Sequence, residues 1–252
     1  MTVISAIRER KMKFKDLFPH SFEALCQEYN IQVPSKLSLV DQCRSDDSEL
    51  CQEMMAEPFA LSETQMHHAA DRYRLGKSKS GKVIYWMIDE LDIVYDGHIG
   101  DSWVSQMLKN RIPEVAPYII TKHCLFGQHL LTLSESSMPI SIVESERSAV
   151  ILSEIYPQSL WMAYAYPANF SERLLEPLQD HHVVLFPNAD ETMETYLAFL
   201  EIADRARRRY HLDVTVSTLL ENRATPSQKT RHIDLLTYWL ESIKNSATFQ
   251  PE

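Results

Sequence analysis

The chain is poor in the residues that punctuate or cross-link small folds. Glycine accounts for five of its 252 residues, and all five lie between Gly76 and Gly127. The four cysteines include no CxxC pair, which argues against a zinc ribbon. A cytoplasmic chain of this length does not need disulfides, so we interpret the cysteines as free thiols.

Long apolar runs are also missing. No run approaches the roughly 18 residues that a membrane-spanning helix requires. The first residues, MTVISAIRERKMKFKDLF, are interrupted by charges and lack the apolar centre of a secretory signal. We therefore predict a cytoplasmic protein with no membrane partner.

Positive charge is in short supply. The formal net charge is −10, which argues against a surface that coats nucleic acid, because phosphate binding needs clustered Lys and Arg. It does not exclude an enzyme that holds a strand in one local groove. The basic residues gather in three clusters, each of which would by default be a solvated face: Arg8 to Lys15, Arg72 to Lys82 and Arg205 to Arg209.

The N-terminal half is predicted to contain two parts. Residues 1–61 form a helical or partly loose extension. Residues 62–137 form an α+β segment, in which Ser62 or Thr64 caps a helix that ends at Gly76. A β-hairpin follows over residues 82–97, because β-branched and aromatic side chains dominate there. Asp101 is then expected to cap a short helix.

Residues 138–245 alternate between short apolar runs and helical patterns. Such alternation predicts an α/β domain with a mostly parallel sheet covered by helices. The long helix after residue 190 should bury Met193, Leu197 and their neighbours at helical spacing. A last helix, capped by Thr225, should continue through Ile233 and Trp239. The expected strands lie near residues 140–144, 160–164, 183–187 and 213–216.

Acidic residues follow two of these strands. Glu144 and Glu146 come after the first, and Asp190 follows Asn188 after the third. Ligands of open parallel sheets bind beyond the carboxyl ends of the strands, and oxygen ligands of this kind suit Mg²⁺. The alternative is that these acids cap the helices that follow. The residues alone leave both interpretations open.

The strings IVESERSAVI and VVLFPNAD resemble the Toprim domain of bacterial primases, topoisomerases and some nucleases. The resemblance is closer to a poorly characterised subgroup, often linked to mobile elements. It extends over residues 62–240 through SLWMAY, VSTLLENRATPSQKTRHIDLL, YRLGKSKSGKVIYWMID and CLFGQHLL. It implies a Toprim-like fold and a role in nucleic-acid metabolism, of a primase or nuclease type.

The resemblance also implies roles for single residues. Glu144 corresponds to the family's catalytic or metal-proximal glutamate, and Asp190 to the second aspartate of its Asp-x-Asp. Asn188 stands where the first aspartate is expected, and Thr237 replaces a later acid. A Mg²⁺ ion bound by Glu144, Glu146, Asn188 and Asp190 is therefore expected to be held weakly.

Two functions follow from these expectations. The first is an active or former metal-dependent enzyme that binds single-stranded or duplex nucleic acid, with Lys77, Lys79 and Lys82 guiding the strand. The second is a non-catalytic interaction module that binds a protein partner through residues 1–60. Whether the chain is an enzyme stays open at this point. The tyrosines Tyr156, Tyr164 and Tyr166 are expected in packing roles rather than as nucleophiles.

Overall fold

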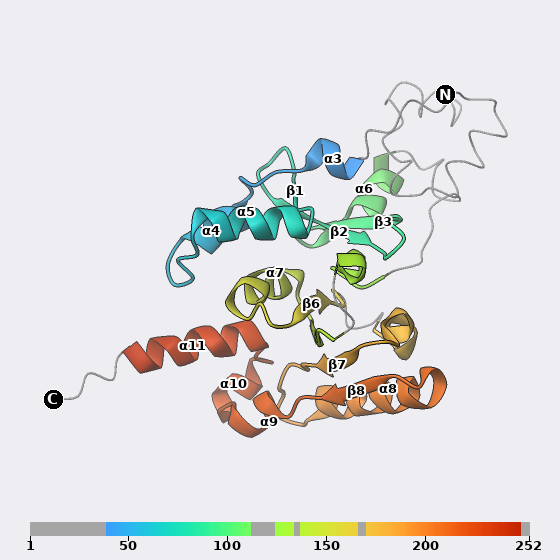
Figure 1. The fold of residues 1–252 in the computed structure, drawn as a ribbon. Coiled ribbons are helices and arrows are strands. Elements are labelled where there is room, and N and C mark those ends of the chain that lie inside the picture. The colour runs from blue at the N-terminus through green and yellow to red at the C-terminus, as the bar shows by residue number, and fades with distance from the viewer. Residues whose placement is uncertain (1–38, 112–123, 134–136, 166–169, 248–252) are drawn as a thin grey trace. The chain divides into compact units, whose positions relative to one another are not determined.

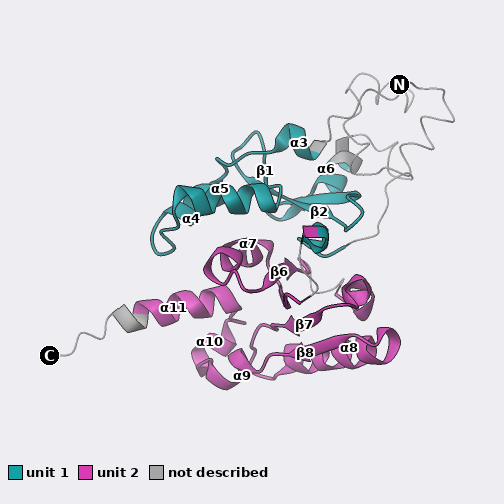
Figure 2. Ribbon diagram, viewed as in Figure 1, with its two compact units in different colours: residues 1–132 teal, residues 133–252 magenta. Residues whose placement is uncertain are grey.

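The computed structural model describes residues 39–111, 124–133, 137–165 and 170–247. The chain divides into two compact units, residues 1–132 and residues 133–252 (Figure 2). Most of the predicted N-terminal extension, residues 1–38, lies outside the described residues, and so does Tyr166. None of the helices within the described ranges is long and apolar enough to cross a membrane.

The first unit contains a four-stranded antiparallel sheet with helices beside it (Figure 1). The sheet order is β1-β2-β3-β4, with all neighbours antiparallel. The strands are β1 (Gly76–Lys77), β2 (Val83–Ile88), β3 (Val94–Ile99) and β4 (Ser102–Trp103). The helices are α3 (Leu39–Cys43), α4 (Glu49–Met55), α5 (Glu63–Arg72), α6 (Val104–Arg111) and the 3-10 turn η2 (Gln128–Leu133).

Several boundaries of the first unit differ from those predicted. Ser62 does cap α5, in a capping box with Gln65. The helix ends at Arg72, however, and Gly76 begins β1 instead of terminating the helix. The cap expected from Asp101 is also wrong, because α6 is preceded by β4, and Asp96 accepts the hydrogen bond of the Ser105 amide at 2.9 Å.

A buried tryptophan organises the sheet of the first unit. Trp86 is 1% exposed and lies against two glycines on the neighbouring strands. A Cβ atom on Gly76 would lie 2.8 Å from the indole Nε1, and one on Gly97 would lie 2.7 Å from the indole Cζ3. The indole can lie this close to the neighbouring strands only because both positions lack a side chain.

The second unit is built around a four-stranded parallel sheet of order β6-β5-β7-β8. The predicted α/β class with a parallel sheet is confirmed, and the strands lie where the apolar runs place them. They are β5 (Ile140–Val143), β6 (Leu160–Ala163), β7 (His182–Leu185) and β8 (Asp213–Val216). The helical elements are α7 (Glu146–Ile155), η4 (Glu172–Leu178), α8 (Glu194–Tyr210), α9 (Leu219–Arg223), α10 (Pro226–Thr230) and α11 (Leu235–Ala247).

Two helix predictions in the second unit need correction. Helix α8 buries Phe199, Ile202 and Ala203, whereas Met193 and Leu197 are 40% and 53% exposed. The final helix is not continuous, since it breaks between α10 and α11 (Figure 1). The capping box of Thr225 and Gln228 does start α10 as predicted.

The connections of the parallel sheet create one special position. From β5 the chain passes through α7 to β6 on one side, and from β7 it passes through α8 to β8 on the other. Right-handed crossovers then place α7 and α8 on opposite faces. Neighbouring strands whose outgoing connections diverge form a topological switch point, where ligands of such folds bind. Here the switch point lies between the ends of β5 and β7.

Candidate functional site

Glu144 and Asn188 meet at the switch point. Glu144 follows β5 directly, and Asn188 lies three residues beyond β7. The side-chain nitrogen of Asn188 donates a hydrogen bond to Oε2 of Glu144. The hydroxyl of Tyr164, just after β6, points at the same oxygen from 3.4 Å. Side chains from the ends of three adjacent strands therefore converge on one carboxylate.

Glu144 is half-buried, and its surroundings disfavour its charge. Burial raises the pKa of Glu144 above its ordinary value, and the negative charges of Asp234 and Glu146 act in the same direction. The hydrogen bond from Tyr164 and the charge of His232 oppose this shift in pKa. Burial, followed by the charge of Glu144, raises the pKa of Tyr164, so that this phenol stays a donor.

The carboxylate of Asp190 accepts hydrogen bonds at the start of α8, which is the capping alternative that the sequence leaves open. Its Oδ1 accepts from the amides of Thr192 and Glu194 and from the Thr192 hydroxyl, and its Oδ2 accepts from the Thr195 amide at 2.8 Å. Burial acts to raise the pKa of Asp190, but these hydrogen bonds outweigh it and hold the pKa well below its ordinary value. The carboxylate thus stabilises the start of α8.

Asp234 has a similar role at the start of α11. Its Oδ1 accepts from the amides of Leu236 and Thr237, and its Oδ2 accepts from the Thr237 hydroxyl at 2.6 Å. The Ser148 hydroxyl of α7 also reaches Oδ1, at 3.4 Å. Asp234 therefore links the α10–α11 turn to the helix that follows Glu144.

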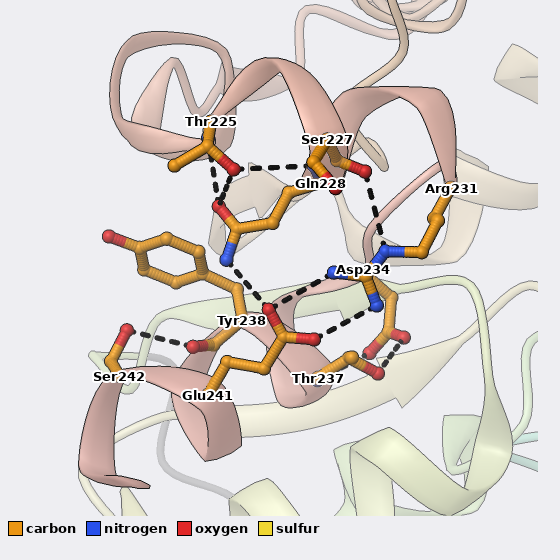
Figure 3. Close-up of polar contacts among 9 residues, drawn as sticks. All are labelled: Thr225, Ser227, Gln228, Arg231, Asp234, Thr237, Tyr238, Glu241 and Ser242. Atoms are coloured by element: carbon orange, nitrogen blue, oxygen red, sulfur yellow. Dashed lines mark hydrogen bonds and ion pairs between the residues drawn. The ribbon is translucent and has the colours of Figure 1, made fainter. Parts of the chain in front are cut away.

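The α10–α11 turn, residues 231–234, is held in place by a polar network (Figure 3). Glu241 accepts from Gln228 at 2.8 Å and from both terminal nitrogens of Arg231 at 3.0 and 3.2 Å. The carbonyl of Ile233 accepts from the Ala189 amide at 3.1 Å, which ties the turn to the segment that carries Asn188. His232 adopts a left-handed φ of 52° and is exposed.

The described side chains do not fit a tightly held Mg²⁺. Magnesium prefers a few strongly anionic ligands in near-octahedral geometry. Asn188 directs its nitrogen at Glu144, and the oxygens of Asp190 and Asp234 accept hydrogen bonds from helix amides. Within the described residues, no group of three His, Cys, Asp or Glu side chains is arranged to hold a metal ion. Glu146 is buried at the first position of α7.

Two residues near Glu144 could not be assigned from the sequence. Tyr164 was expected to pack in the core, and it is buried as expected, but its hydroxyl also reaches Glu144. The resemblance gives no role to His232, although the string TRHIDLL contains it, and its place beside the site depends on the broken helix. The only sequence signal near it is Asp234, which the Toprim resemblance includes.

A family model described as "Domain of unknown function (DUF6371)" matches residues 48–189, more than half of the chain. The chain belongs to this family. The matched DUF6371 region includes Glu144, Glu146 and Asn188 and ends just before Asp190. No curated protein matches the chain.

A solved structure of a primase catalytic domain has a similar fold. The DUF6371 chain matches the DnaG primase catalytic domain bound to ssDNA with a TM-score of 0.50 and 12% identity, over 90% of this chain and 84% of that one. The E. coli primase catalytic core matches with a TM-score of 0.39 and 12% identity, over 94% of this chain and 80% of that one. The first match supports the Toprim-like fold and, at this identity, the fold alone.

Proposed function

We propose that this chain binds single-stranded nucleic acid on a Toprim-like scaffold and that its metal-dependent chemistry is reduced or lost. The observation that carries the proposal is the contact of Glu144 with Asn188 at the switch point. The contact lies where the resemblance puts a Toprim site, and one of the carboxylates expected there is an amide. The link to mobile elements that the resemblance implies belongs to the same proposal.

Nucleic-acid binding is supported by the match in fold to a primase catalytic domain described with ssDNA. It is further supported by the loop between β1 and β2. Lys77, the last residue of β1, is engaged, since it pairs with Asp47 at 2.6 Å. Within the described part of the chain, Lys79 and Lys82 have no acidic partner, and the Lys82 ammonium lies beside Gly100 at the β3–β4 turn.

An aromatic pair lies on the same β3–β4 hairpin. The rings of His98 and Trp103 stack with centroids 4.7 Å apart at 20°, and both side chains are half-exposed. Stacking on aromatic side chains together with Lys contacts to phosphate is how proteins bind single strands without reading the sequence. The β3–β4 hairpin and the loop that carries Lys79 and Lys82 supply both kinds of contact in a chain whose net charge is negative.

The test is a binding measurement with a matched charge control. Fluorescence anisotropy of a labelled oligo-dT is followed with the wild type, with Lys79→Glu/Lys82→Glu, and with Arg173→Glu/Arg223→Glu. Both double variants change the net charge equally, but the arginines are exposed on the second unit. We expect the lysine variant to bind about tenfold more weakly and with a smaller salt dependence, and the arginine variant to bind as the wild type does. Equal losses in both variants, or no binding by the wild type at low salt, would contradict the proposal.

A non-catalytic interaction module is the second candidate. It is favoured by the engagement of Asp190 and Asp234 at helix starts, and by the exposed Met193 and Leu197 at the beginning of α8. A partner bound through residues 1–60 would involve mainly residues outside the described ranges. This candidate function is favoured if the wild type fails to bind the oligonucleotide.

A further inference from the structure

The chain supplies its own hydrogen-bond donors to three carboxylates, one at the end of β5, one after β7 and one at the start of α11. Glu144 receives the Asn188 amide group, Asp190 receives the first amides of α8, and Asp234 receives the first amides of α11. Closely spaced carboxylates repel one another unless a cation or a proton lies between them. Hydrogen-bond donors fixed in the fold reduce this repulsion without any bound ion.

The orientation of the Asn188 side chain follows from electrostatics. If its oxygen faced Oε2 of Glu144, two acceptors would lie in contact with nothing between them. With the nitrogen turned toward Glu144, the contact becomes a hydrogen bond to a charged acceptor, which is stronger than a neutral one. An aspartate at position 188 offers no such donor, and there the pair would need a cation.

We propose that Asn188 takes the place of the divalent cation in this Toprim-like site. Its amide joins the end of β7 to the end of β5 through Glu144, and the Tyr164 hydroxyl supplies a second donor from the end of β6. The side chains at the switch point are therefore held together by the chain's own hydrogen bonds, and their stability does not depend on Mg²⁺. The inference deepens the proposed function and rests on it, since it assumes that the switch point is the Toprim site of a nucleic-acid-binding protein.

The experiment compares melting curves of the full chain in millimolar EDTA and in millimolar Mg²⁺. The variants are Asn188→Asp and Asn222→Asp. The same chemical change at position 222 falls on an exposed residue of α9, where the Asn222 amide donates to the Thr218 hydroxyl. No nucleic acid is present, so this experiment can fail while the oligonucleotide binding holds, and the reverse is equally distinguishable.

We expect the wild-type melting temperature to be the same in both conditions. Asn188→Asp should melt several degrees lower in EDTA, because two carboxylates then face each other, and Mg²⁺ should restore much of the loss by binding the folded state. Asn222→Asp should show neither effect. If Asn188→Asp does not fold in EDTA, recovery of its helical circular dichroism on adding Mg²⁺ is the readout.

Two outcomes would overturn the proposal. A wild type that is clearly stabilised by Mg²⁺ would mean that a cation still serves the site. An Asn188→Asp protein that melts as the wild type does in EDTA would mean that the amide does not hold Glu144. Isothermal titration of the folded wild type with Mn²⁺ gives an independent check, with no binding expected below millimolar concentrations.

Discussion

Four aspartates, two in each unit, accept hydrogen bonds from backbone amides at turns or helix starts. In the first unit, Asp89 accepts from two amides of the β2–β3 turn, and Asp96 accepts from the Gly97 and Ser105 amides. In the second unit, Asp190 and Asp234 accept from amides at helix starts. Glu144 differs, because the donors that reach it are the side chains of Asn188 and Tyr164. The comparison teaches that an acid at a ligand edge can be a structural cap. Glu144 is set apart because no backbone amide among the described residues donates to its carboxylate.

The two units differ in the pKa-shifted group whose protonation affects stability as the pH falls. In the first unit, burial lowers the pKa of His129 to about 4, and its Nε2 lies 3.1 Å from the Arg72 carbonyl. The folded state therefore binds this proton less readily than the unfolded chain, whose histidine has an ordinary pKa near 6.5. In the second unit, the pKa of Asp190 is lowered too, which delays protonation of a group that must stay charged.

The largest expected effect is loss of stability of the first unit in mild acid. The stabilising contribution of neutral His129 is fully present above about pH 6.5 and falls as the pH drops toward 4, by about 3 kcal/mol in total. Urea unfolding between pH 7.5 and pH 4.5 measures it. His129→Gln keeps a donor for the Arg72 carbonyl and should flatten the dependence, and an unchanged pH profile in this variant would show that His129 is not its source.

A smaller effect is expected at Asp190, and it separates capping from metal binding. Asp190→Ala should lower the free energy of unfolding by about 2 kcal/mol, as loss of a strong helix cap does. The cost should be equal in EDTA and in Mg²⁺, because the carboxylate acts on the α8 amides. Chemical denaturation in both conditions checks this, with the exposed Asp180→Ala as control. A loss of unfolding free energy that appears only with Mg²⁺ would indicate that Asp190 is a metal ligand.

The smallest effect is expected at the ion pair of Arg231 and Glu241, which holds the α10–α11 turn. Arg231→Ala removes both of its bonds to Glu241, but the pair is solvent-exposed, so the melting temperature should fall less than in Asp190→Ala. High salt should remove most of the difference, because exposed ion pairs are screened. A loss that persists in high salt would mean that the turn depends on Arg231 packing rather than on its charge.

The sheet of the second unit could be predicted because its strands are short, continuous apolar runs between helical patterns. The face of α8 that packs against the sheet could not be predicted. Its sequence offers overlapping apolar stripes, and the packing of Phe199 and Ile202 against the sheet side selects one of them. The break before α11 was missed because Ile233 continues the helical spacing, and His232 adopts its left-handed φ without glycine as a signal.

The meeting of Glu144 and Asn188 follows from the order of parallel strands, and so it was within reach of the sequence. The hydrogen-bond donors of Asp190 could not be predicted, because the sequence does not distinguish a helix cap from a metal ligand. The observed hydrogen bonds fit the capping alternative that the sequence left open. Tyr164 and His232 reach the site only through tertiary packing, which spacing along the chain does not report.

The close fit of Trp86 between Gly76 and Gly97 has a consequence for the descent of this family. Neither glycine can gain a side chain while the indole stays, and loss of the indole would leave a void that neither glycine fills. The three positions are therefore expected to change together or not at all among relatives. An alignment in which they vary independently would reveal lineages whose antiparallel sheet has been rebuilt.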